Sequence, residues 1–373
     1  MEGGDLFQCP TEVLRKINGF IRALVVDLGH NQRLSIAVDR HRIFCSDSSG
    51  NCFCSSDLPY GIEIVSLEKE GHACRLYILL RVLMIIQQLL LENKHGSKRD
   101  IYYMEQSIFT DQAVINRAIN DICILLKCSQ HHLNVVPVGK GLVMGWLRFL
   151  DAGRIISCIE SPSTAYMIPV CVEEVEDILS HKVDVIDTTD IVSVAQYILV
   201  VEKESVFQRL ANDKFCERHH CIVITGRGYP DVPTRRFLRL LVKELHLPAY
   251  CLVDFDPYGF DILTIYRFGS MQMSYDAKLL RVSEIRWLGV FFSDLERYQL
   301  PERCLLTLTT EDKKKVEAML SRCYLHQEAP QWRLELEMML HKGVKFEIEA
   351  LAAYSLSILA DAYIPRKIQG GHI

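Results

Sequence analysis

The chain has 373 residues, of which 49% are hydrophobic and 24% are charged, so it is a globular chain long enough for two or three domains. Its formal net charge of −5 excludes a uniformly basic nucleic-acid-binding protein. The charge is uneven, because residues 75–154 carry ten Lys and Arg against six Asp and Glu, whereas residues 155–204 carry two against ten. Such asymmetry is typical of a protein that presents one face to a polyanion and another to cations.

The first ten residues, "MEGGDLFQCP", lack the apolar segment of a secretory signal. The most apolar run, "LYILLRVLMIIQQLLL" at residues 76–91, is interrupted by Arg81 and two glutamines. We therefore expect a buried helix here rather than a membrane span, and no membrane partner.

Fourteen cysteines are scattered along the chain, most of them inside apolar segments, which favours reduced thiols in a cytosolic or nuclear protein. Two small groups could bind a metal, but neither has a second pair at zinc-site spacing. These groups are Cys52 with Cys54, and Cys216 with His219 and Cys221.

The first half of the chain predicts helices. Residues 1–74 are a mixed region, with a helix at Glu12–Leu28 and a loop at residues 46–61, which are rich in Ser, Gly, Asn and Asp. Further helices are expected at residues 75–93, 99–104 and 111–127, the last with apolar residues at period 3.6. Residues 133–149 predict two strands around Gly139-Lys140-Gly141.

Three helices followed by a β-hairpin, with local positive charge, favour a winged-helix DNA-binding domain at residues 75–150. Any small helical domain with a hairpin is the alternative. Residues 151–195 are acidic and irregular, and we interpret them as a linker.

Residues 196–373 predict an α/β domain that ends in C-terminal helices. Strands at 197–202, 221–226, 249–256 and 285–290 alternate with helices, and they are continuous apolar runs. Such runs are typical of a parallel, Rossmann-like sheet that helices cover on both faces.

Carboxylates follow two of these strands, with Glu202 at the end of the first and Asp254 and Asp256 after the third. Functional groups of parallel sheets gather at the carboxyl ends of the strands, and neighbouring strands lie about 5 Å apart. Glu202 can therefore meet the Asp pair directly or across one strand. Three carboxylates would repel each other without a cation, so they suit Mg²⁺. The alternative is that Glu202 caps the following helix and that the Asp pair is part of an ordinary turn. A Glu and an Asp-x-Asp at the ends of separate strands resemble the Toprim domain of topoisomerases, primases and related nucleases.

A tyrosine pair, Tyr102 and Tyr103, follows a basic step. Arg99 lies three residues before one and four before the other, so helical spacing alone does not choose between them. A phenol next to a Toprim site and a DNA-binding domain indicates transesterification, in which the phenol attacks a DNA phosphate. The Arg99 guanidinium could hold that phosphate and help stabilise phenolate.

Several motifs, in order, resemble one family: "KRDIYYMEQSIFTDQAVINRAINDI", "GKGLVMG", "ILVVEKESVFQRL", "ITGRGYPD", "DFDPYGFDI" and "YRFGSMQMS". This is the family of the topoisomerase VI A subunit and its eukaryotic meiotic relatives, the sporulation-eleven proteins that make double-strand breaks. The resemblance runs from about residue 75 to "YIPRKI" near the C-terminus, and its nearest likeness is to plant meiotic members.

The resemblance assigns roles to individual residues. It implies that Tyr103 is the nucleophile, that Tyr102 packs, and that Arg99 supports catalysis. It implies that Mg²⁺, for which Mn²⁺ can substitute, is held by three acids, Glu202, Asp254 and Asp256. Lys98 and Lys140 are the DNA-binding candidates, and residues 178–190 depart from the family as an insertion, which is either a surface loop or a disturbance of domain docking.

The function implied is that of a type IIB topoisomerase-like transesterase that makes meiotic double-strand breaks through a covalent tyrosyl intermediate, in the nucleus. The expected partners are double-stranded DNA, a second A-type chain (identical or paralogous) and a topoisomerase VI B-type ATPase, because the chain has no Walker A motif. Two alternatives stay open. One is a Toprim metal-dependent nuclease in which water attacks, and the other is a non-catalytic DNA-binding scaffold.

Overall fold

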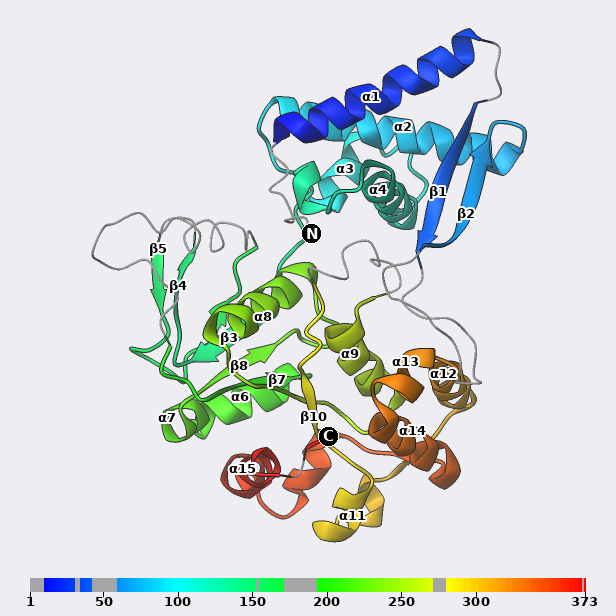
Figure 1. Cartoon of the computed structure of the whole chain (residues 1–373). Helices are drawn as coiled ribbons and strands as arrows, with labels where there is room; N and C mark the ends of the chain where they lie inside the picture. The colour runs from blue at the N-terminus through cyan, green and yellow to red at the C-terminus, as the bar shows by residue number, and fades with distance from the viewer. Residues whose placement is uncertain are drawn as a thin grey trace. The chain divides into compact units, whose positions relative to one another are not determined.

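Two units make up the chain in the computed structural model, coloured along the sequence in Figure 1. The first comprises residues 1–43, 56–138 and 270–278, and the second residues 44–55, 139–269 and 279–373. The structure describes residues 10–30, 34–41, 59–151, 154–170, 193–270, 280–370 and 372–373. Cys52, Cys54, most of the expected loop at 46–61 and the insertion at 178–190 lie outside the described residues.

The helices of the first unit follow the apolar periodicity of the sequence. They are α1 (Pro10–Gly29), α2 (Glu70–Leu91), α3 (Lys98–Met104) and α4 (Gln112–Leu126), with a 3₁₀ turn at His131–Leu133. Each predicted helix is therefore present, and α2 begins earlier than Arg75. Short polar residues set two of the starts: Ser97 and Asp100 form a capping box on α3, and Asp111 accepts the first amides of α4.

Helix α2 is the centre of this unit. By length and composition it could cross a membrane, but half of its most apolar stretch is buried. Its inward side chains join a core with residues such as Val13 of α1, Ile101 of α3 and Ile119 of α4. The expected buried helix is thus confirmed.

In the described part of the first unit, the strands come before α2. β1 (Ser35–His41) pairs antiparallel with β2 (Pro59–Ser66). The hairpin predicted around Gly139-Lys140-Gly141 is wrong, since β3 (Leu142–Gly145) pairs instead with β8 (Cys221–Thr225) and β6 (Tyr166–Met167) of the second unit. All four β3 residues are buried, and a two-stranded wing could not cover them on both faces. Contacts between residues divide the chain after Val138, where the first unit passes into the second. The domain bounds expected from the sequence, including 75–150, stay a prediction.

The second unit is built on a six-stranded sheet in the order β10-β9-β7-β8-β3-β6. The four predicted strands are β7 (Tyr197–Val201), β8 (Cys221–Thr225), β9 (Ala249–Leu252) and β10 (Arg286–Gly289), and they are parallel. β3 and β6 (Tyr166–Met167) extend the sheet antiparallel, and β4 (Arg148–Asp151) and β5 (Arg154–Ser157) form a separate hairpin.

Crossover helices cover both faces of the sheet. They are α6 (Glu204–Asn212), α7 (Phe215–His219), α8 (Val232–Leu245) and α9 (Pro257–Phe268). The chain moves from β7 to β8 in one direction along the sheet, and from β8 through β9 to β10 in the other. Right-handed crossovers therefore place α6 and α8 on opposite faces, as Figure 1 shows. The direction changes between β7 and β9, and their carboxyl ends open the crevice where α/β sheets bind ligands.

The C-terminal part is helical as expected, but short strands interrupt it. Its elements are α11 (Ser293–Arg297), η3 (Glu302–Cys304), β11 (Leu306–Thr307), α12 (Thr310–Leu320), α13 (Cys323–Gln327), α14 (Pro330–Lys342), β12 (Val344–Lys345), η4 (Ile348–Ala353), a π-helical turn (Leu359–Tyr363) and α15 (Ile364–Ile368). Gly343, at φ 68°, ends α14, and β12 then pairs with β11. Phe346 pairs with Phe255, so the residues after β12 lie beside the carboxyl end of β9.

Candidate active site

Glu202 and Asp254 meet directly at the carboxyl ends of two adjacent parallel strands. Glu202 follows β7 immediately, and its backbone N–H donates to the Leu252 carbonyl oxygen of β9 at 3.1 Å. The Asp254 N–H donates to Glu202 Oε2 at 2.9 Å. Of the two arrangements open from the sequence, direct contact or contact across one strand, the structure has direct contact.

The two aspartates differ in their fixed partners. Asp254 Oδ1 accepts from the Ile348 N–H at 2.8 Å. Asp256 caps α9, and its Oδ1 accepts from the N–H groups of Tyr258 and Gly259 at 2.9 and 2.6 Å. Asp256 therefore has the structural role of a helix cap, which agrees in part with the alternative of an ordinary turn. Glu202 is not a helix cap, because the N-cap of α6 is Lys203.

Gly259 lets the helix approach the acids. A Cβ on Gly259 would lie 2.6 Å from the Asp254 carbonyl oxygen and 2.9 Å from Glu202 Oε2. Both distances are shorter than van der Waals contact, so a larger residue would push the first turn of α9 away from the two strands.

Glu202 and Asp254 are buried, and Asp256 is half-buried. Glu202 is 9% exposed and Asp254 4%. Burial, followed by repulsion from Asp254, raises the pKa of Glu202 to about 8, and burial raises the pKa of Asp254 to about 6. Burial also raises the pKa of Asp256. The cluster is therefore short of cationic partners at neutral pH.

Lys203 is a cation in direct contact with the cluster. Its Nζ lies 2.9 Å from Asp254 Oδ2, 3.0 Å from Glu347 Oε2 and 2.9 Å from Glu349 Oε2. Burial opposes its charged form, yet hydrogen bonds to Asp254, Glu349 and Glu347 raise the pKa of Lys203 overall. The two glutamates were missed in the sequence because their segment was interpreted as helix; their i, i+2 spacing, the same as in the Asp pair, was the available signal.

The donor chemistry of Glu202, Asp254 and Asp256 fits a hard divalent cation, since it is all carboxylate oxygen and lacks positive charge. Glu202 Oε1 and Asp256 Oδ2 accept no hydrogen bond from the described residues, whereas both oxygens of Asp254 are engaged. Within the described ranges, no group of three or more His, Cys, Asp or Glu side chains is already arranged to hold a metal. Direct contact is therefore shown for Glu202 and Asp254, and Asp256 follows two residues after Asp254.

The tyrosine pair of α3, in the first unit, has one buried and one exposed member. Tyr102 is partly buried and packs against the core, whereas Tyr103 is 63% exposed, with the two rings edge to face at 5.3 Å. Glu105, just after α3, pairs with Arg81 of α2 and ties the end of the helix to the unit. Tyr103 is therefore the member of the pair that can reach a ligand.

The basic candidates differ in exposure and partners. Arg99 is exposed on α3, while burial lowers the pKa of its half-buried neighbour Lys98. Lys140 belongs to the second unit, where its N–H donates to Asp231 Oδ2 at 2.6 Å and its Nζ donates to the Arg227 carbonyl oxygen at 3.1 Å. These contacts tie Lys140 to the loop between β8 and α8.

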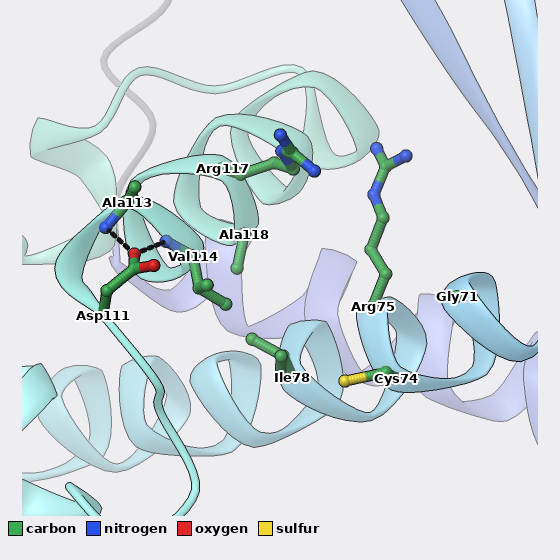
Figure 2. Close-up of a pocket in the computed structure, with 9 residues that line it drawn as sticks. All are labelled: Gly71, Cys74, Arg75, Ile78, Asp111, Ala113, Val114, Arg117 and Ala118. Atoms are coloured by element: carbon green, nitrogen blue, oxygen red, sulfur yellow. Dashed lines mark hydrogen bonds between the residues drawn. The ribbon is translucent and has the colours of Figure 1, made fainter.

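Two other places were candidates for binding. Cys216 and Cys221 are buried, with their sulfurs 3.9 Å apart, as small hydrophobic residues would be. A cavity of about 270 Å³ lies between α2 and α4 of the first unit, lined in part by Arg75 and Arg117 (Figure 2). Arg75 already pairs with Asp121 of α4, so its charge serves the packing of the two helices.

Family models match both units. Residues 197–368 match the Toprim domain of the family that unites the topoisomerase 6 A subunit with Spo11, and residues 75–135 match a type IIB DNA topoisomerase model. The α/β fold, with a helical DNA-topoisomerase domain before a Toprim sheet, is therefore confirmed. Glu202, Asp254 and Asp256 lie in the first match, and Arg99 and Tyr103 lie in the second.

Whole relatives match over nearly the full chain. Meiotic recombination protein SPO11-1 of Oryza sativa subsp. indica is 60% identical over 97% of this chain and 93% of the relative. The Arabidopsis thaliana protein of the same name is 58% identical over 99% of this chain and 98% of the relative. The A subunit of DNA topoisomerase 6 from Arabidopsis thaliana is 39% identical over 78% of this chain and 65% of the relative. The expected likeness to plant meiotic members is confirmed, and the chain belongs to the family of Spo11 and the topoisomerase 6 A subunit.

Proposed function

We infer that this chain is a type IIB topoisomerase-like DNA transesterase, and that it makes the DNA double-strand breaks that initiate meiotic recombination. The observation that carries this function is the match of both units to one DNA-cleaving family, with an exposed tyrosine in the first unit and buried acids at the strand ends of the second. A non-catalytic DNA-binding scaffold has no need for buried carboxylates in contact, such as Glu202 and Asp254, whose closeness raises the pKa of Glu202.

Tyr103 is the proposed nucleophile. Its phenolic oxygen forms a bond to a DNA phosphorus while the bond from phosphorus to one deoxyribose oxygen breaks. The phenol loses a proton and the departing deoxyribose hydroxyl gains one. The tyrosyl phosphodiester replaces the phosphodiester of the DNA backbone, so the free energy of that bond is kept. Arg99, exposed one turn before Tyr103, is positioned to hold the phosphate, and Lys98 and Lys140 remain proposals for backbone contacts.

Glu202, Asp254 and Asp256 are the proposed ligands of a divalent metal, Mg²⁺ by preference, with Mn²⁺ as a substitute. Such a metal supplies positive charge next to a phosphate during transesterification. The acids supply the hard oxygen donors, and two of them, Glu202 and Asp254, are buried.

The proposed partners follow from the reaction and from the relatives. A double-strand break needs two nucleophiles and each chain offers one Tyr103, so we propose a twofold dimer, either of this chain or with a paralogous A-type chain. Double-stranded DNA is the substrate, and a B-type ATPase subunit is the proposed third partner, because relatives are named as the A subunit of topoisomerase 6. Since the substrate is chromosomal DNA, the nucleus is the proposed location.

The test is to trap the covalent intermediate. Purified chain, a candidate B-type partner, duplex DNA and Mg²⁺ are denatured together, and protein-linked DNA is isolated. We expect adducts that nuclease trims to a phosphotyrosine at Tyr103, loss of adducts by more than about a thousandfold in Tyr103→Phe, and a milder effect in Tyr102→Phe, the matched control. Cleaved DNA without any protein-linked end would instead establish hydrolysis, and DNA binding without cleavage would favour a scaffold.

A further inference from the structure

Lys203 has all its hydrogen-bonding capacity used by acids. An ammonium group has three N–H donors, and the Lys203 Nζ lies within 3.0 Å of Asp254, Glu347 and Glu349. The side chain is 25% exposed and its residue is the N-cap of α6, so the backbone around it is fixed by the same strand end that places Glu202.

Its three partners come from two parts of the chain. Asp254 follows β9, whereas Glu347 and Glu349 flank the first residue of η4, whose Ile348 N–H also holds Asp254 Oδ1. Glu349 has a further partner, Ser205 Oγ, at 2.8 Å, and its side chain is 33% exposed against 58% for Glu347. The ammonium therefore lies between one proposed metal ligand and two carboxylates that are not proposed ligands.

We propose that Lys203 is the resident counter-cation of Asp254 in the metal-free protein, and that a divalent ion displaces its ammonium onto Glu347 and Glu349. This inference rests on the proposed metal site. An ammonium 2.9 Å from Asp254 Oδ2 competes with any other cation for that carboxylate oxygen. Lys203 is thus a positioning residue that sets the affinity of the site.

The physical basis is competition between cations for one carboxylate. An opposite charge within about 4–6 Å stabilises a carboxylate by the equivalent of 1–3 pKa units, and a metal must displace that interaction to bind. The flexible lysine stem allows the ammonium to leave Asp254 while it keeps two other carboxylates. Glu347 and Glu349 therefore lower the cost of displacement.

The first experiment measures metal binding directly. Mg²⁺ and Mn²⁺ are titrated by calorimetry into the full chain without DNA, and thermal unfolding is followed in EDTA. For Lys203→Met we expect affinity to rise about tenfold while the melting temperature of the metal-free protein falls. Lys203→Arg, which keeps the charge, should stay near the wild-type affinity. If Lys203→Met does not fold, Lys203→Gln, which retains an N–H donor, takes its place.

Lys315→Met is the matched control. Its ammonium lies 2.7 Å from Asp261 Oδ2 and its side chain is 26% exposed, close to the 25% of Lys203, so the substitution removes a similarly exposed lysine whose acid partner is not a proposed ligand. We expect a lower melting temperature with unchanged metal affinity. Equal or weaker metal binding in Lys203→Met, relative to wild type, would overturn the inference.

A double-mutant cycle tests the role of the acceptor acids. Glu349→Gln should weaken metal binding in the wild-type background, because the ammonium then stays on Asp254, and should weaken it less in the Lys203→Met background. The same loss in both backgrounds would mean that Glu349 acts on the metal without Lys203. Failure of the metal site itself is distinguishable: if wild type and Asp256→Asn give the same titration, the proposed ligands are wrong.

Discussion

The buried Glu202 carboxyl predicts that the metal-free protein loses stability as the pH rises. Its pKa is raised from an ordinary value of 4.5 to about 8. A carboxyl with a raised pKa binds more protons in the folded protein than in the unfolded chain. Its contribution to stability is therefore complete below about pH 4.5 and is lost as the pH rises through about 8.

The size of the loss follows from the same values. One pKa unit corresponds to about 1.4 kcal/mol. Between pH 6 and pH 8 the unfolded glutamate is already ionised while folded Glu202 still releases its proton. The free energy of unfolding should then fall by about 2 kcal/mol over this range. The pKa of Asp254 is raised only to about 6, so most of the dependence above pH 6 belongs to Glu202.

Tryptophan fluorescence is a suitable assay because Trp146, Trp287 and Trp332, the three tryptophans of the chain, all belong to the second unit. Urea unfolding in EDTA is measured at pH 6, 7 and 8. We expect Glu202→Gln to lose most of the pH dependence, because an amide does not ionise.

The control for this prediction is Glu204→Gln. Glu204 is partly exposed and pairs with Arg227 at 3.0 Å, so its loss should leave the pH dependence in place. Saturating Mg²⁺ should also flatten the wild-type curve, because the cation favours the ionised carboxylates. A Glu202→Gln protein with the wild-type pH dependence would refute the reasoning.

Three further substitutions test other parts of the structure. Gly259→Ala should weaken metal binding and lower stability by about 1–3 kcal/mol, measured by calorimetry and urea unfolding, because its Cβ would press on Asp254; unchanged affinity would mean that α9 can shift freely. Lys367→Met should lower stability by about 3–5 kcal/mol, measured by tryptophan fluorescence, because the buried Asp294 carboxylate loses its cationic partner at 2.8 Å and keeps only neutral donors; a neutral effect would contradict this. Arg99→Ala should reduce covalent adducts about 10–100-fold, with partial recovery in Arg99→Lys, and equal adduct yields would remove Arg99 from the catalytic site.

Much of the second unit was predictable from the sequence, because its signals are local. Continuous apolar runs can form strands only where helices cover both faces, so the four parallel strands were found at their observed places. The carboxyl ends of such strands share one edge, which predicted that Glu202 and Asp254 meet. In the structure the Asp254 N–H donates to Glu202 Oε2 at 2.9 Å. The helices of the first unit followed from period 3.6 in the same way.

Tertiary structure alone decided the remaining features, because they depend on partners distant in the sequence. β3 looked like a hairpin strand, and only its pairing with β8 places it in the sheet. Helical spacing did not choose between Tyr102 and Tyr103; the family resemblance implied Tyr103, and the structure shows that the core covers Tyr102 and leaves Tyr103 exposed. Glu347 and Glu349 reach Lys203 only because β12 follows α14 and directs the chain past β9. The contact from Lys203 to Glu349 spans 146 residues, and a contact of that range leaves no periodic pattern in the sequence.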